Sequence, residues 1–266
     1  MSKLNVSTKS VSDWGETELK YLRIKIQTVH DFITFFQCEP PDLVDDCLYI
    51  SHYNINFSTL SQENKQVQRF VKSLHHATIT HTNNENNVDA FAQYILQLFD
   101  YDEGNKVIGM RLELPLHMCG TKVYAKPDIY VEDLSTEIKL LVQEDKSYNT
   151  TISVGYDLIE IEAQMVSNAI ASFQANNSKF YSKDLPMQSH KLMPCIVMLG
   201  TYPIFYLFEI TIELSDNIKY GIYPEVDTII KRYQPVKSQQ REQTLYDIDK
   251  RIKIFQCYQA FRKFVQ

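Results

Sequence analysis

The sequence predicts an α/β domain in which a mixed sheet, centred on an antiparallel meander, lies between helices. Three observations lead to this fold class. Residues 106–119, 120–133 and 136–147 are runs of strand-forming residues joined by short turns. Apolar stripes at helical spacing precede and follow them, over 88–99 and 157–175. Residues 193–214 then supply two more strands, hinged at residues 200–203, which are expected to extend the sheet.

Length and composition indicate one domain with elaborations. The chain has 266 residues and 44% hydrophobic content, enough to bury a sizeable core. The first ten residues are polar, so we expect a flexible N-terminus over residues 1–20. Residues 21–266 are then expected to form a single domain, with an N-terminal helical elaboration and a C-terminal covering helix over 243–265.

The sequence also indicates an intracellular protein, cytoplasmic or nuclear, that has no membrane partner. It contains no run of about 18 uncharged apolar residues, and its beginning lacks the apolar core of a signal peptide. The five cysteines are odd in number and widely spaced, without a C-x-x-C pair. They are therefore expected to pack in the core rather than to form disulfides or a zinc site.

The N-terminal part of the domain is expected to contain one strand and two helices. Residues 22–29 alternate apolar and polar side chains, as a strand does, and residues 30–37 favour a short helix that Pro40 and Pro41 end. Residues 61–76 predict a longer helix with an apolar face. The single tryptophan, Trp14, is expected to pack an N-terminal cap onto the domain.

Three charged residues stand where apolar strands end. Asp128 lies in the segment AKPDIYV, while Glu144 and Lys146 lie in LLVQEDKS. Since side chains alternate along a strand, Glu144 and Lys146 are expected on one face and Asp145 on the other. Facing side chains on neighbouring strands lie within about 5 Å of each other, so Asp128 and Glu144 are expected to be close.

Such a group of charges is costly to bury unless a metal, a mutual ion pair or solvent compensates it. Two adjacent carboxylates suit Mg²⁺ or Mn²⁺, which prefer oxygen ligands. A bound ion of this kind polarises a phosphoryl oxygen and lowers the pKa of a bound water, and Lys146 would then position that water or neutralise developing charge. The chemistry indicated is phosphodiester hydrolysis.

Three polar residues on the flanking helices are further candidates. Glu85 and Asp89 share a face at the start of the helix over 88–99, where acids either join a metal site or complement the helix dipole. Gln164 lies mid-helix in the 157–175 segment, on a polar strip with Glu160 and Asn168. It is either part of the site or an exposed glutamine in a helix that it favours.

The Pro127-Asp128 pair followed by Glu144-Asp145-Lys146 resembles the signature of the PD-(D/E)XK nuclease superfamily. The resemblance implies a restriction-endonuclease-like core that runs helix, three-stranded meander, helix, strand. It also implies that Asp128 and Glu144 bind the metal together with the backbone carbonyl of Asp145. Gln164 would contact the metal-bound water or the scissile phosphate.

A narrower resemblance covers the chain from about residue 20 to its end. The segments NVDAFAQYILQLFDYD, KPDIYV, LLVQEDKS, EAQMVSNAIASFQANN and MLGTYPIFYLFEIT together are similar to a family of fungal proteins with a PD-(D/E)XK nuclease-like domain. This similarity favours Glu85, which precedes VDAF, over Asp89 as the residue that completes the acidic cluster. It implies a fold and a chemistry but no substrate.

The leading hypothesis is therefore a metal-dependent nuclease that acts on DNA rather than RNA, with a homodimer as a candidate assembly. The alternative is a noncatalytic module that keeps the nuclease fold and binds a protein or a nucleic acid. The net charge of −6 argues against a highly basic, nonspecific nucleic-acid binder. Residues 231–266, however, carry nine Lys or Arg against three Asp or Glu, and they either meet phosphates or form a solvated helix face. Tyr202, Phe205 and Tyr206 either stack on bases or pack in the sheet.

Overall fold

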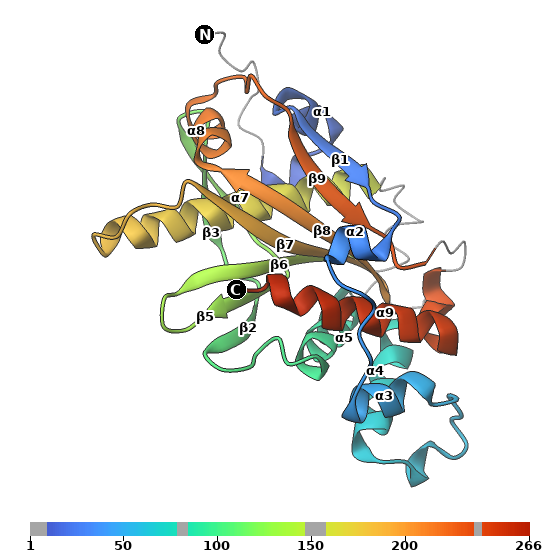
Figure 1. Ribbon diagram of the computed structural model, residues 1–266. Helices are drawn as coiled ribbons and strands as arrows, with labels where there is room; N and C mark the ends of the chain where they lie inside the picture. Colours follow the sequence, from blue (N-terminus) through green and yellow to red (C-terminus); the bar gives the residue numbers. More distant parts are fainter. Residues whose placement is uncertain (1–9, 79–84, 147–157, 237–240) are drawn as a thin grey trace.

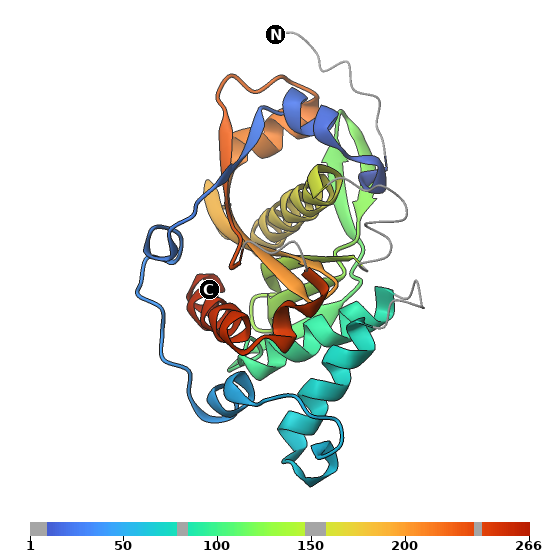
Figure 2. The ribbon, with the colours of Figure 1, turned by 90° about the vertical axis from the view of Figure 1, so that its right-hand side faces the viewer.

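The chain folds into a mixed sheet with helices on both faces (Figures 1 and 2). The computed structural model describes residues 10–78, 85–146, 158–236 and 241–266. The expected loop over residues 147–156 and the first nine residues lie outside these ranges. The α/β class and the mixed sheet predicted from the sequence are confirmed.

Within the described ranges the central sheet has seven strands in the order β1-β9-β8-β7-β6-β5-β2. Their bounds are β1 Ile24–Thr28, β9 Thr228–Tyr233, β8 Tyr202–Thr211, β7 His190–Leu199, β6 Ile138–Lys146, β5 Ile129–Asp133 and β2 Lys106–Met110. Only β1 with β9 and β6 with β7 pair in parallel; the other neighbours are antiparallel. Strand β6 is central and almost wholly buried, as its continuous apolar run predicts.

The meander is present as β2, β5 and β6, but the first two expected strands are each interrupted. Strands β3 Leu114–Met118 and β4 Thr121–Ala125 form a separate hairpin between β2 and β5. Arg111, directly after β2, has a φ of 54°, and Pro127, before β5, has no N–H for a ladder. These two positions end the long strands that periodicity alone predicted. The expected turn at Cys119 and Gly120 is correct, and both residues have positive φ.

One face of the sheet is covered by the long helix α7 Leu158–Ser182 together with α1 Glu16–Tyr21, α8 Ile212–Tyr220 and the β3–β4 hairpin (Figure 2). Helix α7 links the parallel strands β6 and β7, which need a crossover connection. It is longer than the 157–175 predicted, and residues on almost every side of its first four turns are buried. It therefore lies inside the molecule, between the sheet and the hairpin.

The other face is covered by helices from both ends of the chain. These are α2 Phe32–Phe36, α3 Asp45–His52, α4 Lys65–Thr78, α5 Glu85–Leu98 and α9 Ile248–Phe261. Short 3-10 turns accompany them at Leu60–Gln62, Arg241–Tyr246 and Arg262–Phe264. The apolar stripes predicted for α4 and α5 are buried. The expected C-terminal helix starts later, because Asp247 caps the N-terminus of α9 through the Lys250 amide.

Two expectations for the chain ends need correction. Residues 10–20, assigned to a flexible N-terminus, form the 3-10 turn Val11–Asp13 and most of α1, because Val11, Trp14 and Leu19 find apolar partners in the core. The basic residues of 231–266 are not all on a solvated face. Arg251 is fully buried and donates to the backbone carbonyls of Ser51, Leu245 and Tyr53.

The aromatic residues of the β7–β8 hairpin pack in the sheet. Tyr202, Phe205 and Tyr206 are all at most 2% exposed, which leaves no ring face for a base. The cysteines of the described ranges are unpaired, and none lies in a disulfide there. Among the described residues, no helix combines the length and the apolar character needed to cross a membrane.

Candidate functional site

The predicted carboxylates meet where β5 begins and β6 ends. Asp128 lies in the bend directly before β5, rather than within the strand, and Glu144, Asp145 and Lys146 are the last three residues of β6. The strands are antiparallel and Ile129 pairs with Gln143, so Asp128 stands opposite Glu144. The expected proximity of the two acids follows from this register.

Hydrogen bonds tie these residues into one group. Lys146 Nζ lies 2.7 Å from Glu144 Oε1 and 3.1 Å from the Asp145 carbonyl oxygen. The Asp145 amide donates to Asp128 Oδ2 at 2.8 Å. One carboxylate and a backbone carbonyl thus bind the Lys146 ammonium group, and Asp128 is near enough for its charge to act on it. Lys146 and Glu144 lie on the same face of β6, as the alternation predicted.

The side chain of Asp145 points to the opposite face. It is fully buried, and its Oδ1 accepts a hydrogen bond of 2.7 Å from Gln143 Nε2. Burial, reinforced by the charge of Asp128, raises the pKa of Asp145 well above its usual range. The backbone of Asp145, and not its side chain, therefore lies with the site. Its carbonyl is the part that the resemblance assigned to a metal.

Asn168 on α7 is a site residue that the sequence analysis did not select. Its Nδ2 donates to Glu144 Oε2 at 2.9 Å, and its Oδ1 accepts from the Lys126 amide at 3.1 Å. It therefore ties the end of β6 to the segment that carries Asp128. The available signal was its place four residues after Gln164 on the same polar strip.

Gln164 lies one turn earlier on α7 and makes a different contact. Its Nε2 donates to the Ser12 carbonyl oxygen at 3.1 Å, and the residue is 8% exposed. The structure therefore brings Gln164 to the N-terminal segment that covers α7. In the described residues the helix contact to Glu144 is made by Asn168 instead.

Glu85 and Asp89 approach the site from the first turns of α5. Glu85, the first residue of the helix, is near enough for its charge to act on Asp128, Glu144 and Lys146. Asp89 is 2% exposed and binds the Arg111 guanidinium at 2.7 Å. The charges of both acids therefore act on Asp128, but Asp89 is also bound to a cation.

The site holds more negative charge than its cations balance. Burial raises the pKa of Asp128 to about 6, against the opposing charge of Lys146. Burial and the charge of Asp128 raise the pKa of Glu144 to about 8. Burial alone would lower the pKa of Lys146, but Glu144 and Asp128 outweigh it and raise that pKa above its usual range. Several shifted pKa values in one group of residues are typical of functional sites.

The donor chemistry fits a hard divalent cation. Asp128, Glu144 and the Asp145 carbonyl offer oxygens, the ligands that Mg²⁺ prefers, and Mg²⁺ commonly keeps several waters. No group of three or more His, Cys, Asp or Glu side chains suited to a metal occurs in the ranges that the structure describes. A metal here would therefore have two side-chain ligands, one carbonyl and water, and Lys146 would have to move away from Glu144.

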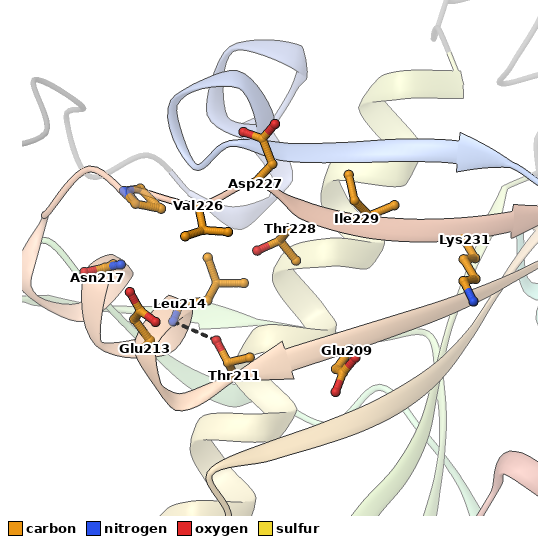
Figure 3. Close-up of a pocket in the computed structure, with 11 residues that line it drawn as sticks. Glu209, Thr211, Glu213, Leu214, Asn217, Val226, Asp227, Thr228, Ile229 and Lys231 are labelled. Carbon is orange, nitrogen blue, oxygen red and sulfur yellow. Dashed lines mark hydrogen bonds between the residues drawn. The ribbon is translucent and has the colours of Figure 1, made fainter.

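An open hollow of about 400 Å³ lies elsewhere, between β8, β9 and α8 (Figure 3). Its polar lining includes Glu209, Thr211, Glu213, Asp227 and Lys231, and none of the predicted site residues contributes to it. Asp227 is already paired with Arg23 and Lys25. The hollow is therefore separate from the carboxylate group.

Comparison with known protein families finds no family that matches this chain, and a search of curated proteins finds no significant match. The function is therefore inferred from the geometry and electrostatics of the carboxylate group.

Proposed function

We propose that this protein is a metal-dependent nuclease that hydrolyses phosphodiester bonds of a nucleic acid, DNA rather than RNA. The observation that carries the proposal is the grouping of Asp128, Glu144 and the Asp145 carbonyl at one end of the β5–β6 hairpin, where Lys146 binds Glu144 Oε1 and the Asp145 carbonyl and the Asp145 amide binds Asp128 Oδ2. This oxygen set would hold Mg²⁺ or Mn²⁺. The Lys146 ammonium group beside it is suited to the charge that develops during phosphoryl transfer.

The order of elements supports a restriction-endonuclease-like core. Helix α5 is followed by the antiparallel strands β2, β5 and β6, then by helix α7 and by β7, which pairs in parallel with β6. This is the helix, meander, helix, strand order that the PD-(D/E)XK resemblance implies. The β3–β4 hairpin is an insertion into that order.

Each residue of the group has a distinct role in this proposal. Asp128 and Glu144 bind the metal with the Asp145 carbonyl, and Glu85 adds negative charge at the edge. When bound, Mg²⁺ or Mn²⁺ polarises a phosphoryl oxygen and lowers the pKa of water. Lys146, released from Glu144, orients the attacking water and neutralises charge on the phosphate. Water adds its oxygen to phosphorus and loses a proton to solvent as the bond to one ester oxygen breaks, and the departing alkoxide takes up a proton from solvent.

Gln164 is assigned a supporting role through α7. Its contact with Ser12 links the N-terminal segment to the helix that carries Asn168, and Asn168 holds Glu144 in place. The direct contact with water or phosphate that the resemblance implies would require Gln164 to leave Ser12.

One observation favours the noncatalytic alternative. Both carboxylate oxygens of Glu144 already have partners, Lys146 on Oε1 and Asn168 on Oε2. A carboxylate satisfied in this way needs no metal. In the alternative, the Glu144–Lys146 pair is structural and the acidic surface binds a protein or nucleic-acid partner.

Calorimetric titration of Mn²⁺ into the full chain tests the proposal. We expect saturable binding in the wild type and none in Asp128→Asn, since the substitution removes the charge of one of two carboxylate ligands. Asp133→Asn is the matched control, because Asp133 is also an aspartate of the β5–β6 hairpin but lies at the other end of β5. It should bind Mn²⁺ like the wild type.

Cleavage of single- and double-stranded DNA and of RNA is then measured with the same three proteins. Metal-dependent cleavage that is lost in Asp128→Asn and kept in Asp133→Asn supports the proposal. A folded wild type that binds no Mn²⁺, with or without an oligonucleotide present, would contradict it in favour of the noncatalytic module.

A further inference from the structure

Arg111 lies beside the carboxylate group, directly across from Asp128. It directly follows β2, and its amide donates to the Asp128 carbonyl oxygen at 3.0 Å. Its φ of 54° is uncommon for a residue with a side chain. The turn after β2 therefore places the arginine where β5 begins, next to Asp128, and Asp128 in turn stands opposite Glu144.

The guanidinium group is held on one side only. Its Nη2 donates to Asp89 Oδ2 at 2.7 Å and also to the side chain of Asn86, both on α5. Asp89 is buried, whereas the Arg111 side chain is 49% exposed. Among the described residues, Nε and Nη1 have no hydrogen-bond partner. The arginine is thus oriented by a buried carboxylate and presents donors to solvent.

A nucleic acid that approaches this group of residues meets a concentration of negative charge. Glu85, Asp89, Asp128 and Glu144 are opposed by Lys146 and Arg111, and the Lys146 side chain is only 13% exposed and bound to Glu144. A phosphate close to Asp128 therefore needs an exposed cation. Lys126 is also exposed, but its contact with Glu113 is a long one of 3.7 Å, so its position is less well fixed than that of Arg111.

We propose that Arg111 is a phosphate-binding residue, oriented by Asp89 and Asn86, that holds the nucleic-acid backbone beside Asp128. The proposal rests on the proposed function for its substrate class. A planar guanidinium suits this role because it can give two parallel hydrogen bonds to one phosphate. Asp89 acts as a positioning residue, because it fixes the guanidinium without facing the substrate itself.

The test compares two arginines of matched surroundings. Arg23 also has a positive φ of 52°, is 48% exposed on its side chain and pairs with an aspartate at 2.7 Å, but it lies at β1, the opposite edge of the sheet from β2. Binding of labelled single-stranded DNA, double-stranded DNA and RNA of one sequence is measured by fluorescence anisotropy with Ca²⁺, over a range of salt concentrations. The oligonucleotides are checked afterwards for integrity.

For the oligonucleotide that binds best, Arg111→Ala should weaken binding about 10-fold and reduce the slope of log K against log salt by about 1. Arg111→Lys should keep the slope and lose part of the affinity, because the charge stays and the paired hydrogen bonds do not. Asp89→Asn should give an intermediate loss. Arg23→Ala should bind like the wild type. Mn²⁺ titration of Arg111→Ala should match that of the wild type.

The outcomes separate this proposal from that of the nuclease. Arg111-dependent binding without cleavage supports the phosphate site and counts against catalysis. Unchanged affinity in Arg111→Ala, an equal loss in Arg23→Ala, or no oligonucleotide binding by the wild type overturns the phosphate site. Loss of Mn²⁺ binding in Arg111→Ala also overturns it, because the arginine would then support the fold of the metal site rather than the substrate.

Discussion

The β5–β6 hairpin carries an Asp, a Glu and a Lys at each of its two ends. At the open end are Asp128, Glu144 and Lys146; at the turn are Glu132, Asp133 and Lys139. Each end has a Lys–Glu ion pair of low exposure. The pKa values of the two aspartates are shifted in opposite directions: that of Asp128 is raised to about 6, and that of Asp133 is lowered to about 2.

The physical cause of this difference is how each aspartate is satisfied. Asp133 Oδ1 accepts hydrogen bonds from the amides and hydroxyls of Ser135 and Thr136, so the fold stabilises its charge. Asp128 is more buried and lies near Glu85, Asp89 and Glu144, with one amide donor. At the turn end, the charged groups stabilise the turn itself. The open end keeps a surplus of negative charge that a cation would relieve.

The largest expected difference between the ends is in activity when each lysine is removed. Lys146→Ala should reduce metal-dependent cleavage at least about 100-fold, because it removes the cation that faces the reacting phosphate. Lys139→Ala should cleave like the wild type but lose about 3 kcal/mol of unfolding free energy, because the largely buried carboxylate of Glu132 then has no cation to pair with. Initial cleavage rates and urea unfolding measure the two effects.

The stability of Lys146→Ala distinguishes the two functional hypotheses. In a nuclease, the raised pKa of Glu144 lets this carboxyl group remain neutral when its partner is lost, and the unfolding free energy falls by less than about 2 kcal/mol. The alternative outcome is a loss of 3 to 5 kcal/mol in unfolding free energy, roughly the cost of breaking a buried ion pair, together with no activity in the wild type. It would mean that the ion pairs at both ends of the hairpin serve only to stabilise the fold.

The open end was largely predictable from the sequence because strand periodicity fixes it. The alternation of residues 144–146 and the turn before β6 place Glu144, Lys146 and Asp128 together without any knowledge of the rest of the fold. The helices were predictable for the same reason, since their apolar stripes recur at a fixed spacing.

Contacts set by tertiary packing were not predictable in this way. Asn168 and Gln164 lie four residues apart on the same polar strip, and only the position of α7 along its axis relative to β6 decides which one reaches Glu144. Arg111 was missed because its role depends on a positive φ that ends β2 early. Helix α8 and strand β9 were not predicted either, because both are short and neither has a clear pattern of apolar and polar residues. The position of β9 is set by its pairing with β8 and β1.

Two asparagines of α7 provide the next comparison, because each one fastens one end of β6. Asn176 binds the amide and the carbonyl of Lys139 at 2.7 and 2.9 Å, and Asn168 binds Glu144 and the Lys126 amide. Asn176→Ala should cost about 2 to 4 kcal/mol in unfolding free energy, since it leaves two buried backbone groups without partners. Asn168→Ala should cost about 1 to 2 kcal/mol.

The same two variants should differ in their affinity for Mn²⁺. Asn168→Ala should weaken Mn²⁺ binding about 10-fold, because a residue that orients a metal ligand has been lost. Asn176→Ala should leave Mn²⁺ affinity unchanged wherever the protein is folded. Equal Mn²⁺ affinities for both variants and the wild type would mean that Asn168, like Asn176, serves only to fasten the strand.

The smallest expected effect is the difference in pKa between Asp128 and Asp133, which compares the two ends of the hairpin most directly. In metal-free buffer, NMR titration of the aspartate carboxyl carbons should give midpoints near 6 for Asp128 and near 2 for Asp133, on either side of the ordinary 3.8. The stability that Asp133 adds is present above pH 3.8 and is lost as the pH falls through 2, because its folded pKa is lowered. Asp128 acts in the opposite sense: its folded pKa is raised, so stability declines as the pH rises from 3.8 through 6. Assignment uses Asp128→Asn and Asp133→Asn, each of which removes one signal. Midpoints that coincide near 3.8 would mean that the two ends of the hairpin are electrostatically alike, and the surplus charge that motivates a cation site would be absent.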